Sequence, residues 1–470
     1  MKFTASVISI RKASLMGLGP VMTWSSSRVL QRVLLLTLLF ASLPTLLAAS
    51  MNTSALKSGD LKRLEKRLGR AITQQDAEAA SIIVSDLVED ASPEALSLIL
   101  TAMIQIESSE FFEESLEQLS AVDSERLGEY FEDLLAKKKS SPDKVALVMI
   151  VGGKMTDSRS EQWLLQGLRH QRELVTRMAI DSVRERRSKA AIPVLIEILE
   201  ERGIDGGALA FEARNTLISF TQRNFDTAAD WRKFWDANQE TIDPQLIGDE
   251  DGTTGVAPVD PDNMPEFFGL KIVSTNVVFL VDISGSMLQY DEDAKGTDGT
   301  EKGRQRITRV QRELGEAIMK LSKDAYFNVI AFNDRVDRFQ KKLVKAKRGA
   351  KGSALKFVNK LNADRGTDTG LALEAAFEDP RVDTVVLLSD GAPHTQAGEP
   401  QQLIPIVEQK LRNLNRLRKV RLYTLGFAGE GKWPTGSKYS GQQIRANPAE
   451  LERFLTRLAE EHGGNYRRID

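Results

Sequence analysis

The 470-residue chain contains no cysteine and has only three histidines, His170, His394 and His462. The lack of cysteine excludes disulfide bonds, zinc–thiolate and iron–sulfur centres, and a cysteine nucleophile. The histidines lie far apart in the sequence, which leaves little material for a histidine-rich metal site. Any metal in this protein must therefore be bound mainly by oxygen atoms.

An excess of charge of one sign is also missing. Lysine and arginine number 64 and aspartate and glutamate 66, for a formal net charge of −2. This balance gives no global case for nucleic-acid binding or for electrostatic docking to a membrane. The hydrophobic share of 41% is enough for packed cores, and the length suits two or three domains.

The sequence has one long hydrophobic run, VLLLTLLFASLPTLL at residues 33–47, preceded by Arg28 and Arg32 and followed by Ala48-Ala49-Ser50. A basic flank, a short apolar stretch and small residues after it are typical of a secretory signal. We therefore expect residues 1–50 to be a signal peptide or an uncleaved N-terminal anchor, with Met1 or Met22 as the start. The prediction is an extracytoplasmic protein, periplasmic or secreted, whose only membrane attachment is such an anchor.

Residues 55–240 carry apolar side chains at helical spacing, for example Leu61, Leu64 and Leu68. Ser92-Pro93 and Ser141-Pro142 are typical of helix starts, with a capping serine before a proline in the first turn. Short helices separated by polar turns, without strand alternation, predict an all-α helical-repeat solenoid.

Residues 174–199, which end in the helix-forming run AIPVLIEIL, resemble a HEAT repeat. The resemblance implies stacked helix pairs and a scaffold or protein-binding surface. Near the end of this region Trp231, Phe234 and Trp235 share one helical face. We interpret these aromatic residues as a cap over the last repeat.

Residues 243–266 are rich in Asp, Gly and Pro and predict an acidic, flexible linker. After them, apolar β-rich runs at 277–281, 329–332, 385–388 and 422–427 alternate with helical patterns. Near-continuous apolar strands separated by helices predict a doubly wound, mostly parallel α/β sheet with helices on both faces. Ligands of such sheets bind beyond the carboxyl ends of the strands.

Polar residues cluster where these strands end. The first strand runs into Asp282-Ile283-Ser284-Gly285-Ser286, a D-x-S-x-S pattern; Thr367 and Thr369 precede a later helix; and another strand runs into Ser389-Asp390. Two carboxylates and three hydroxyls at one sheet edge would suit a hard divalent cation, Mg²⁺ or Mn²⁺, with Ca²⁺ also compatible.

The segments FLVDISGSM, RGTDTG and LLSDG make residues 270–470 similar to a von Willebrand factor type A domain with a complete metal-ion-dependent adhesion site. The resemblance implies that three hydroxyls ligate the metal and that two carboxylates act mostly through bound water. A departure from the family pattern is Asp368, where many relatives carry a neutral residue. The predicted metal site consists of Asp282, Ser284, Ser286, Thr367 and Asp390.

We expect a non-enzymatic protein that binds partners through the metal, which accepts an Asp or Glu carboxylate from a partner protein. One alternative is a metal-assisted hydrolase with His394 as its base. Another is a helical-repeat scaffold with a vestigial metal site. Residues 291–302 are interpreted as a loop beside the site, and the basic runs at 341–351 and 412–421 as solvated faces, with docking of an acidic partner as the alternative.

Overall fold

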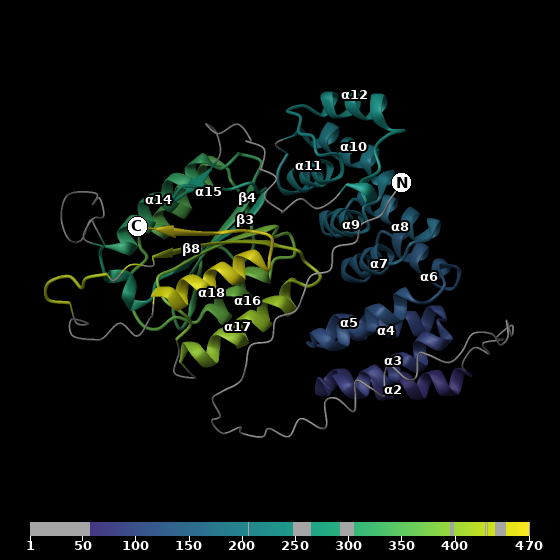
Figure 1. The fold of residues 1–470 in the computed structure, drawn as a ribbon. Coiled ribbons are helices and arrows are strands. Elements are labelled where there is room, and N and C mark those ends of the chain that lie inside the picture. Colours follow the sequence, from purple (N-terminus) through teal and green to yellow (C-terminus); the bar gives the residue numbers. More distant parts are fainter. Residues whose placement is uncertain are drawn as a thin grey trace, which may run out of the picture. The chain divides into compact units, whose positions relative to one another are not determined.

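The computed structural model describes residues 57–204, 206–247, 265–291, 305–394, 399–427, 429, 431–437 and 448–469 (Figure 1). All of these described residues belong to one compact unit. The predicted signal or anchor at residues 1–50 and most of the predicted linker lie outside the described residues. None of the described helices is long and apolar enough to cross a bilayer.

The first part of this unit is built from consecutive helices, as the apolar spacing predicts. Ser92 caps α4 by accepting a hydrogen bond from the Ala95 N–H, whereas the Ser141 side chain makes no such bond to α7. Gly203, with φ of 79°, follows α10 and ends it. The helices are α2 (Ser58–Gln74), α3 (Ala77–Asp90), α4 (Pro93–Gln105), α5 (Ser109–Ser120), α6 (Ser124–Ala136), α7 (Pro142–Lys154), α8 (Ser158–Leu168), α9 (Glu173–Arg186), α10 (Ile192–Arg202), α11 (Ala208–Thr221) and α12 (Ala228–Asn238).

These helices stack in two rows. Even-numbered helices from α2 to α12 contact one another in succession, and so do odd-numbered helices from α3 to α11. One continuous apolar core runs between the rows, as expected of a solenoid. At its end Trp231 and Trp235 of α12 are buried, and the Trp231 ring meets Phe225 edge-on at 5.0 Å. The predicted aromatic cap is therefore present.

The second part contains a sheet in the order β5-β4-β3-β7-β8-β9, with β6 also pairing β4. Strands β4, β3, β7, β8 and β9 run parallel, and β5 and β6 are antiparallel to β4. Strands β1 and β2 pair with each other in a separate two-stranded antiparallel sheet. The strands are β1 (Glu266–Phe267), β2 (Leu270–Lys271), β3 (Asn276–Asp282), β4 (Tyr326–Phe332), β5 (Val336–Arg338), β6 (Val344–Lys345), β7 (Thr384–Ser389), β8 (Arg421–Phe427) and β9 (Tyr466–Ile469).

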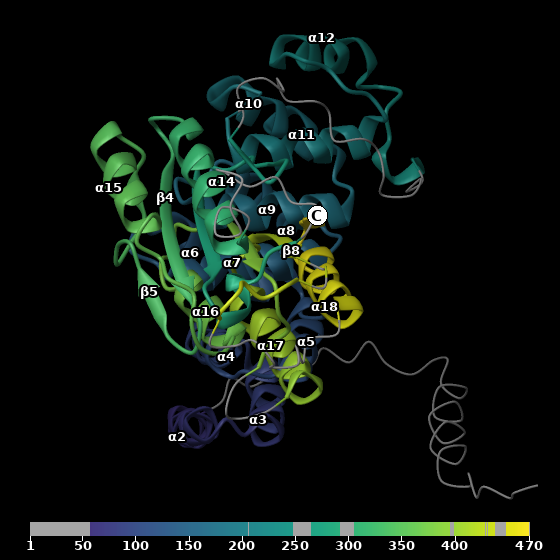
Figure 2. The ribbon, with the colours of Figure 1, turned by 90° about the vertical axis from the view of Figure 1, so that its left-hand side faces the viewer.

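Helices cover both faces of this sheet, as Figures 1 and 2 show. Val277, Phe279 and Val281 of β3 pack in one core with α14 (Arg306–Lys320) and α15 (Arg348–Val358). Val278 and Leu280 pack in a second core with α16 (Thr369–Phe377), α17 (Pro400–Asn415) and α18 (Pro448–Glu460). Alternate side chains of a strand point to opposite faces, so β3 is apolar from Val277 to Val281 because both of its faces are buried. The prediction of a doubly wound, mostly parallel sheet is confirmed.

The basic run at 412–421 departs from the prediction of a solvated face. Arg421 is 8% exposed, forms an ion pair with Glu212 of α11 and stacks on Phe211, 4.3 Å from the ring centroid. Arg416 donates to the carbonyl of Ile104 at 3.0 Å. This part of the run therefore packs against the helical repeats, which the local sequence could not reveal because the partners of Arg421 and Arg416 lie 209 and 312 residues away.

Candidate metal centre

The first loop of the site follows β3 directly. Asp282 ends the strand and is fully buried, and one of its carboxylate oxygens accepts the backbone N–H of Ser284 at 2.7 Å. A single 3-10 turn at residues 285–288 comes next. The turn brings the Ser284 and Ser286 hydroxyl oxygens to 3.0 Å from each other. The D-x-S-x-S segment thus gathers one carboxylate and two hydroxyls.

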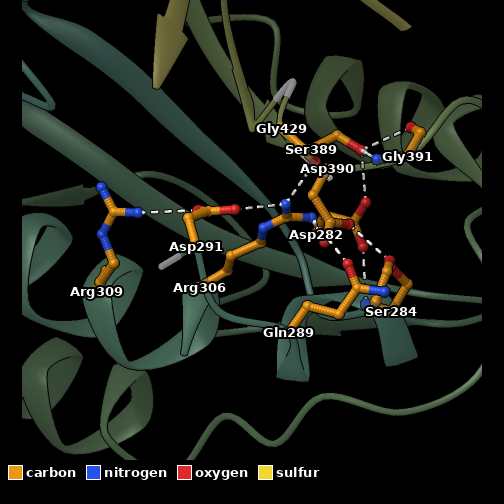
Figure 3. Close-up of polar contacts among 11 residues, drawn as sticks. Asp282, Ser284, Gln289, Asp291, Arg306, Arg309, Ser389, Asp390, Gly391 and Gly429 are labelled. Atoms are coloured by element: carbon orange, nitrogen blue, oxygen red, sulfur yellow. Dashed lines mark hydrogen bonds and ion pairs between the residues drawn. The ribbon is translucent and has the colours of Figure 1, made fainter. Parts of the chain in front are cut away.

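Asp390 enters this group from the end of β7. Its Oδ1 accepts a hydrogen bond from the Ser286 hydroxyl at 2.6 Å. The neighbouring Ser389 hydroxyl donates to the second carboxylate oxygen of Asp282 at 2.5 Å (Figure 3). Because β3 and β7 are adjacent parallel strands, their carboxyl ends meet at one edge and these side chains converge.

Thr367 belongs to the third loop, which backbone hydrogen bonds join to the other two. Its N–H and carbonyl both pair with His394, each at 2.9 Å. Two residues earlier, the carbonyl of Arg365 accepts the N–H of Gly285 at 2.9 Å. The Thr367 hydroxyl oxygen lies 3.6 Å from the place a Cβ on Gly391 would occupy. The third loop therefore lies against both of the others, with the Thr367 hydroxyl beside Gly391.

The two residues that follow Thr367 lie at the start of α16. Asp368 caps α16 by accepting the Leu371 N–H at 2.9 Å, so one of its carboxylate oxygens is engaged by the helix. Thr369, the first residue of α16, is 1% exposed, and its hydroxyl has no hydrogen-bond partner among the described residues.

Burial gives the two aspartates unusual electrostatics. Removal from water, and secondarily the negative charge of Asp390, raises the pKa of Asp282 to about 7. Burial also raises the pKa of Asp390, although the positive charge of Arg306 opposes that shift. Two buried carboxylates, each hydrogen-bonded to a serine hydroxyl, favour a bound cation, because a cation offsets the cost of burying their charge.

The donor set fits a hard divalent cation. It holds carboxylate and hydroxyl oxygens and no nitrogen or sulfur, which is the chemistry that Mg²⁺, Mn²⁺ and Ca²⁺ prefer. No group of three or more His, Asp and Glu side chains placed to hold a metal occurs in the described part of the chain. A cation at this edge therefore depends on the serine and threonine hydroxyls as well as on Asp282 and Asp390.

Sequence reasoning did not assign roles to two residues that shape this site. The sequence showed Ser389 only as the residue before Asp390 and gave no sign of its hydrogen bond to Asp282. Arg306 is a buried arginine in the first turn of α14, and its guanidinium lies 3.0 Å from Asp390 Oδ2. A positive charge is unfavourable at a helix N-terminus, so an arginine there without acidic neighbours in the turn was a usable signal.

Comparisons with known proteins agree with this architecture. Residues 276–466 match the family model described as von Willebrand factor type A domain. Among curated proteins, the chain is 28% identical over 213 residues to rat inter-alpha-trypsin inhibitor heavy chain H3, covering 43% of this chain and 20% of the relative. It is 23% identical over 221 residues to mouse inter alpha-trypsin inhibitor heavy chain 4, covering 44% and 19%. The chain thus spans about a fifth of the length of these relatives.

Solved structures with some similarity include a von Willebrand factor type A protein from Catenulispora acidiphila. It is 20% identical with a TM-score of 0.30, and the match covers 43% of this chain and 40% of that one. An aerotolerance-related membrane protein from Bacteroides fragilis is 19% identical with a TM-score of 0.31, covering 42% and 92%. The family match and the observed sheet support a von Willebrand factor type A domain at residues 276–466, preceded by helical repeats.

Proposed function

We propose that this protein is an exported interaction protein that binds a divalent cation at the edge of its sheet and, through that cation, a carboxylate of a partner protein. The observation that carries the proposal is the buried convergence of Asp282 and Asp390 with the hydroxyls of Ser284 and Ser286. Thr367, in the adjoining loop, completes the proposed set of ligands. The preferred ion is Mg²⁺, with Mn²⁺ and Ca²⁺ compatible.

The ligand types favour binding over catalysis. Hydroxyls are neutral ligands, so an ion held mainly by them keeps much of its positive charge and attracts an Asp or Glu side chain as a further ligand. This chain's own residues supply the buried setting, and Asp282 and Asp390 offset part of the ion's charge. No substrate needs to be transformed in such an arrangement, and we propose a non-enzymatic role.

The rest of the chain completes the proposal. Residues 1–50 act as signal peptide or anchor and direct the protein outside the cytoplasm. Residues 55–240 form HEAT-like repeats that offer a second protein-binding surface, and residues 243–266 connect them to the domain at 270–470. In the described structure, contacts such as the ion pair of Arg421 with Glu212 also hold the two parts together.

A displayed library of random peptides tests the proposed binding chemistry. Peptides selected on the protein in Mg²⁺ should carry an essential Asp or Glu, and their binding should disappear in EDTA and in the Ser284→Ala variant. Ser353→Ala is the matched control, because this serine is exposed on α15, on another part of the domain. Peptides that bind equally well in EDTA, or without an acidic residue, would contradict a metal-bridged carboxylate.

One observation keeps the hydrolase alternative open to test. The backbone of His394 pairs with that of Thr367, a proposed ligand, and the His394 side chain is 41% exposed. A metal-assisted hydrolase would need such a base. Turnover of a phosphate or carboxylic ester that depends on Mg²⁺ and is lost in His394→Ala would favour that alternative over adhesion.

A further inference from the structure

Arg306 places a buried, positively charged side chain next to the candidate metal centre. Its side chain is 2% exposed, and its Nη1 lies 3.0 Å from Asp390 Oδ2, a buried carboxylate whose other oxygen accepts the Ser286 hydroxyl. A guanidinium stays protonated in proteins, so Arg306 carries a full positive charge beside a proposed ligand.

The guanidinium is also fixed in position. Its Nη2 donates to Asp291 at 2.7 Å and to the carbonyl of Gly429 at 2.8 Å (Figure 3). Its centre lies 5.5 Å from the Phe427 ring centroid. Contacts on several sides leave the side chain little room to swing away from Asp390. A charge that cannot move away acts on anything bound at Asp390.

Asp291 does not cancel this charge, because it has a second partner. Its other carboxylate oxygen accepts from Arg309 Nη1 at 3.1 Å. Asp291 and Arg309 balance each other, which leaves the charge of Arg306 to act on Asp390. With Asp282 and Asp390 both ionised, the centre together with Arg306 carries one unit of negative charge, and a divalent cation brings it to one unit of positive charge.

We propose that Arg306 is a positioning residue that sets the charge of the metal centre, weakening its hold on the cation while strengthening the capture of a carboxylate. This inference rests on the proposed function. The positive guanidinium competes with the cation for Asp390, so metal affinity is lower than the ligand set alone would give. The same charge keeps the loaded centre positive, which favours an anionic partner group over water.

The expected changes in metal affinity and in carboxylate affinity have opposite signs. Simple damage to the site would weaken both, so the two explanations can be told apart. In Arg306→Gln the loaded centre becomes neutral. We expect Mg²⁺ to bind about tenfold more tightly to this variant, because a neighbouring like charge has been removed. We expect binding of acetate, the smallest carboxylate probe, to the Mn²⁺-loaded protein to weaken about tenfold for the same reason.

Calorimetric titration of metal-free full-length protein with Mg²⁺ measures the first effect, and ¹³C relaxation of acetate by the Mn²⁺-loaded protein measures the second. Arg306→Lys keeps a positive charge beside Asp390 while losing the planar fork of donors, and should stay within about threefold of the wild type in both. Arg312→Gln is the matched control, because Arg312 lies on the same helix and pairs with Glu313. It should also leave both affinities within about threefold of the wild type, because it removes a more distant charge.

Weaker or unchanged Mg²⁺ binding in folded Arg306→Gln would overturn the inference while leaving the metal site standing. If only the variant binds Mg²⁺, the inference holds and the proposed function fails in the wild type. If neither binds, both fail. Should Arg306→Gln fold only with Mg²⁺ present, that dependence supports the inference. Should it not fold at all, Arg306→Lys decides: affinities near those of the wild type support the role of charge, and a tenfold change contradicts it.

Discussion

Asn276 and Asp282 occupy opposite ends of strand β3 and contact different parts of the chain. The Asn276 amide donates to Glu173 of the helical repeats at 3.3 Å, whereas Asp282 lies in the candidate metal centre. Arg421, which binds Glu212 of the repeats, likewise begins β8. These contacts lie at the amino ends of parallel strands. The opposite, carboxyl edge of the sheet, which holds the candidate site, is therefore available to other partners.

The ion pair between Arg421 and Glu212 should contribute measurably to stability. The side chains are only 9% and 20% exposed, and Glu212 also accepts from Arg184 at 3.1 Å. Replacing Glu212 by Gln leaves Arg421 buried without its counter-charge, and we expect the free energy of unfolding to fall by about 2 kcal/mol. Urea unfolding followed by circular dichroism measures the change.

The matched control is Glu200→Gln, which removes the partner of Arg232 in a pair whose side chains are 41% and 30% exposed. Water screens this pair, so its loss should cost less than about 1 kcal/mol. Equal losses in the two variants would show that burial of Arg421 against the repeats does not matter for stability.

His462 should make the fold sensitive to acid. Burial, reinforced by the nearby charges of Arg412 and Lys419 and opposed by that of Glu461, lowers the pKa of His462 from 6.5 to about 4. The folded state therefore binds the proton less well than the unfolded state. The contribution of neutral His462 to the free energy of unfolding is fully present above pH 6.5 and is lost as the pH falls from 6.5 to about 4.

The test of this prediction compares the wild type with His462→Gln, which can still accept the hydrogen bond from Asn415 that His462 Nδ1 accepts. We expect the wild type to lose about 3 kcal/mol more than the variant across that pH range. Urea midpoints measured at several pH values give the difference. Parallel pH profiles for the two proteins would contradict a buried neutral histidine.

Two glycines should respond to alanine in opposite directions. A Cβ on Gly464 would lie 2.1 Å from the carbonyl oxygen of Leu422, at the start of β8, and this backbone atom cannot move aside cheaply. We expect Gly464→Ala to destabilise the protein by about 2 kcal/mol. Gly352, inside α15, has open space around it, and Gly352→Ala should stabilise by about 0.5–1 kcal/mol. Thermal melts of both variants decide this, and a stable Gly464→Ala protein would contradict the close packing at β8.

The sequence predicted the features that depend on residues close together in the chain and missed those that depend on distant partners. Apolar runs marked β3, β7 and β8 because both faces of each strand are buried. The position of Asp282 and Asp390 followed from parallel strands ending at one edge. The role of Arg421 could not be read from local sequence, because its partner Glu212 lies 209 residues away. Arg306 stood out locally as an arginine in the first turn of a helix, but its partner Asp390 lies 84 residues away.

Calorimetric titration of metal-free full-length protein with Mg²⁺, beside Ser284→Ala, is the decisive measurement for the proposed metal centre. The Ser284 hydroxyl is 3.0 Å from that of Ser286 in the centre, and alanine removes this oxygen with little change in volume. We predict saturable binding at one site in the wild type and its loss in the variant, with Ser353→Ala binding as the wild type does. Absence of binding in the wild type, or equal binding in Ser284→Ala, would contradict the proposed metal centre.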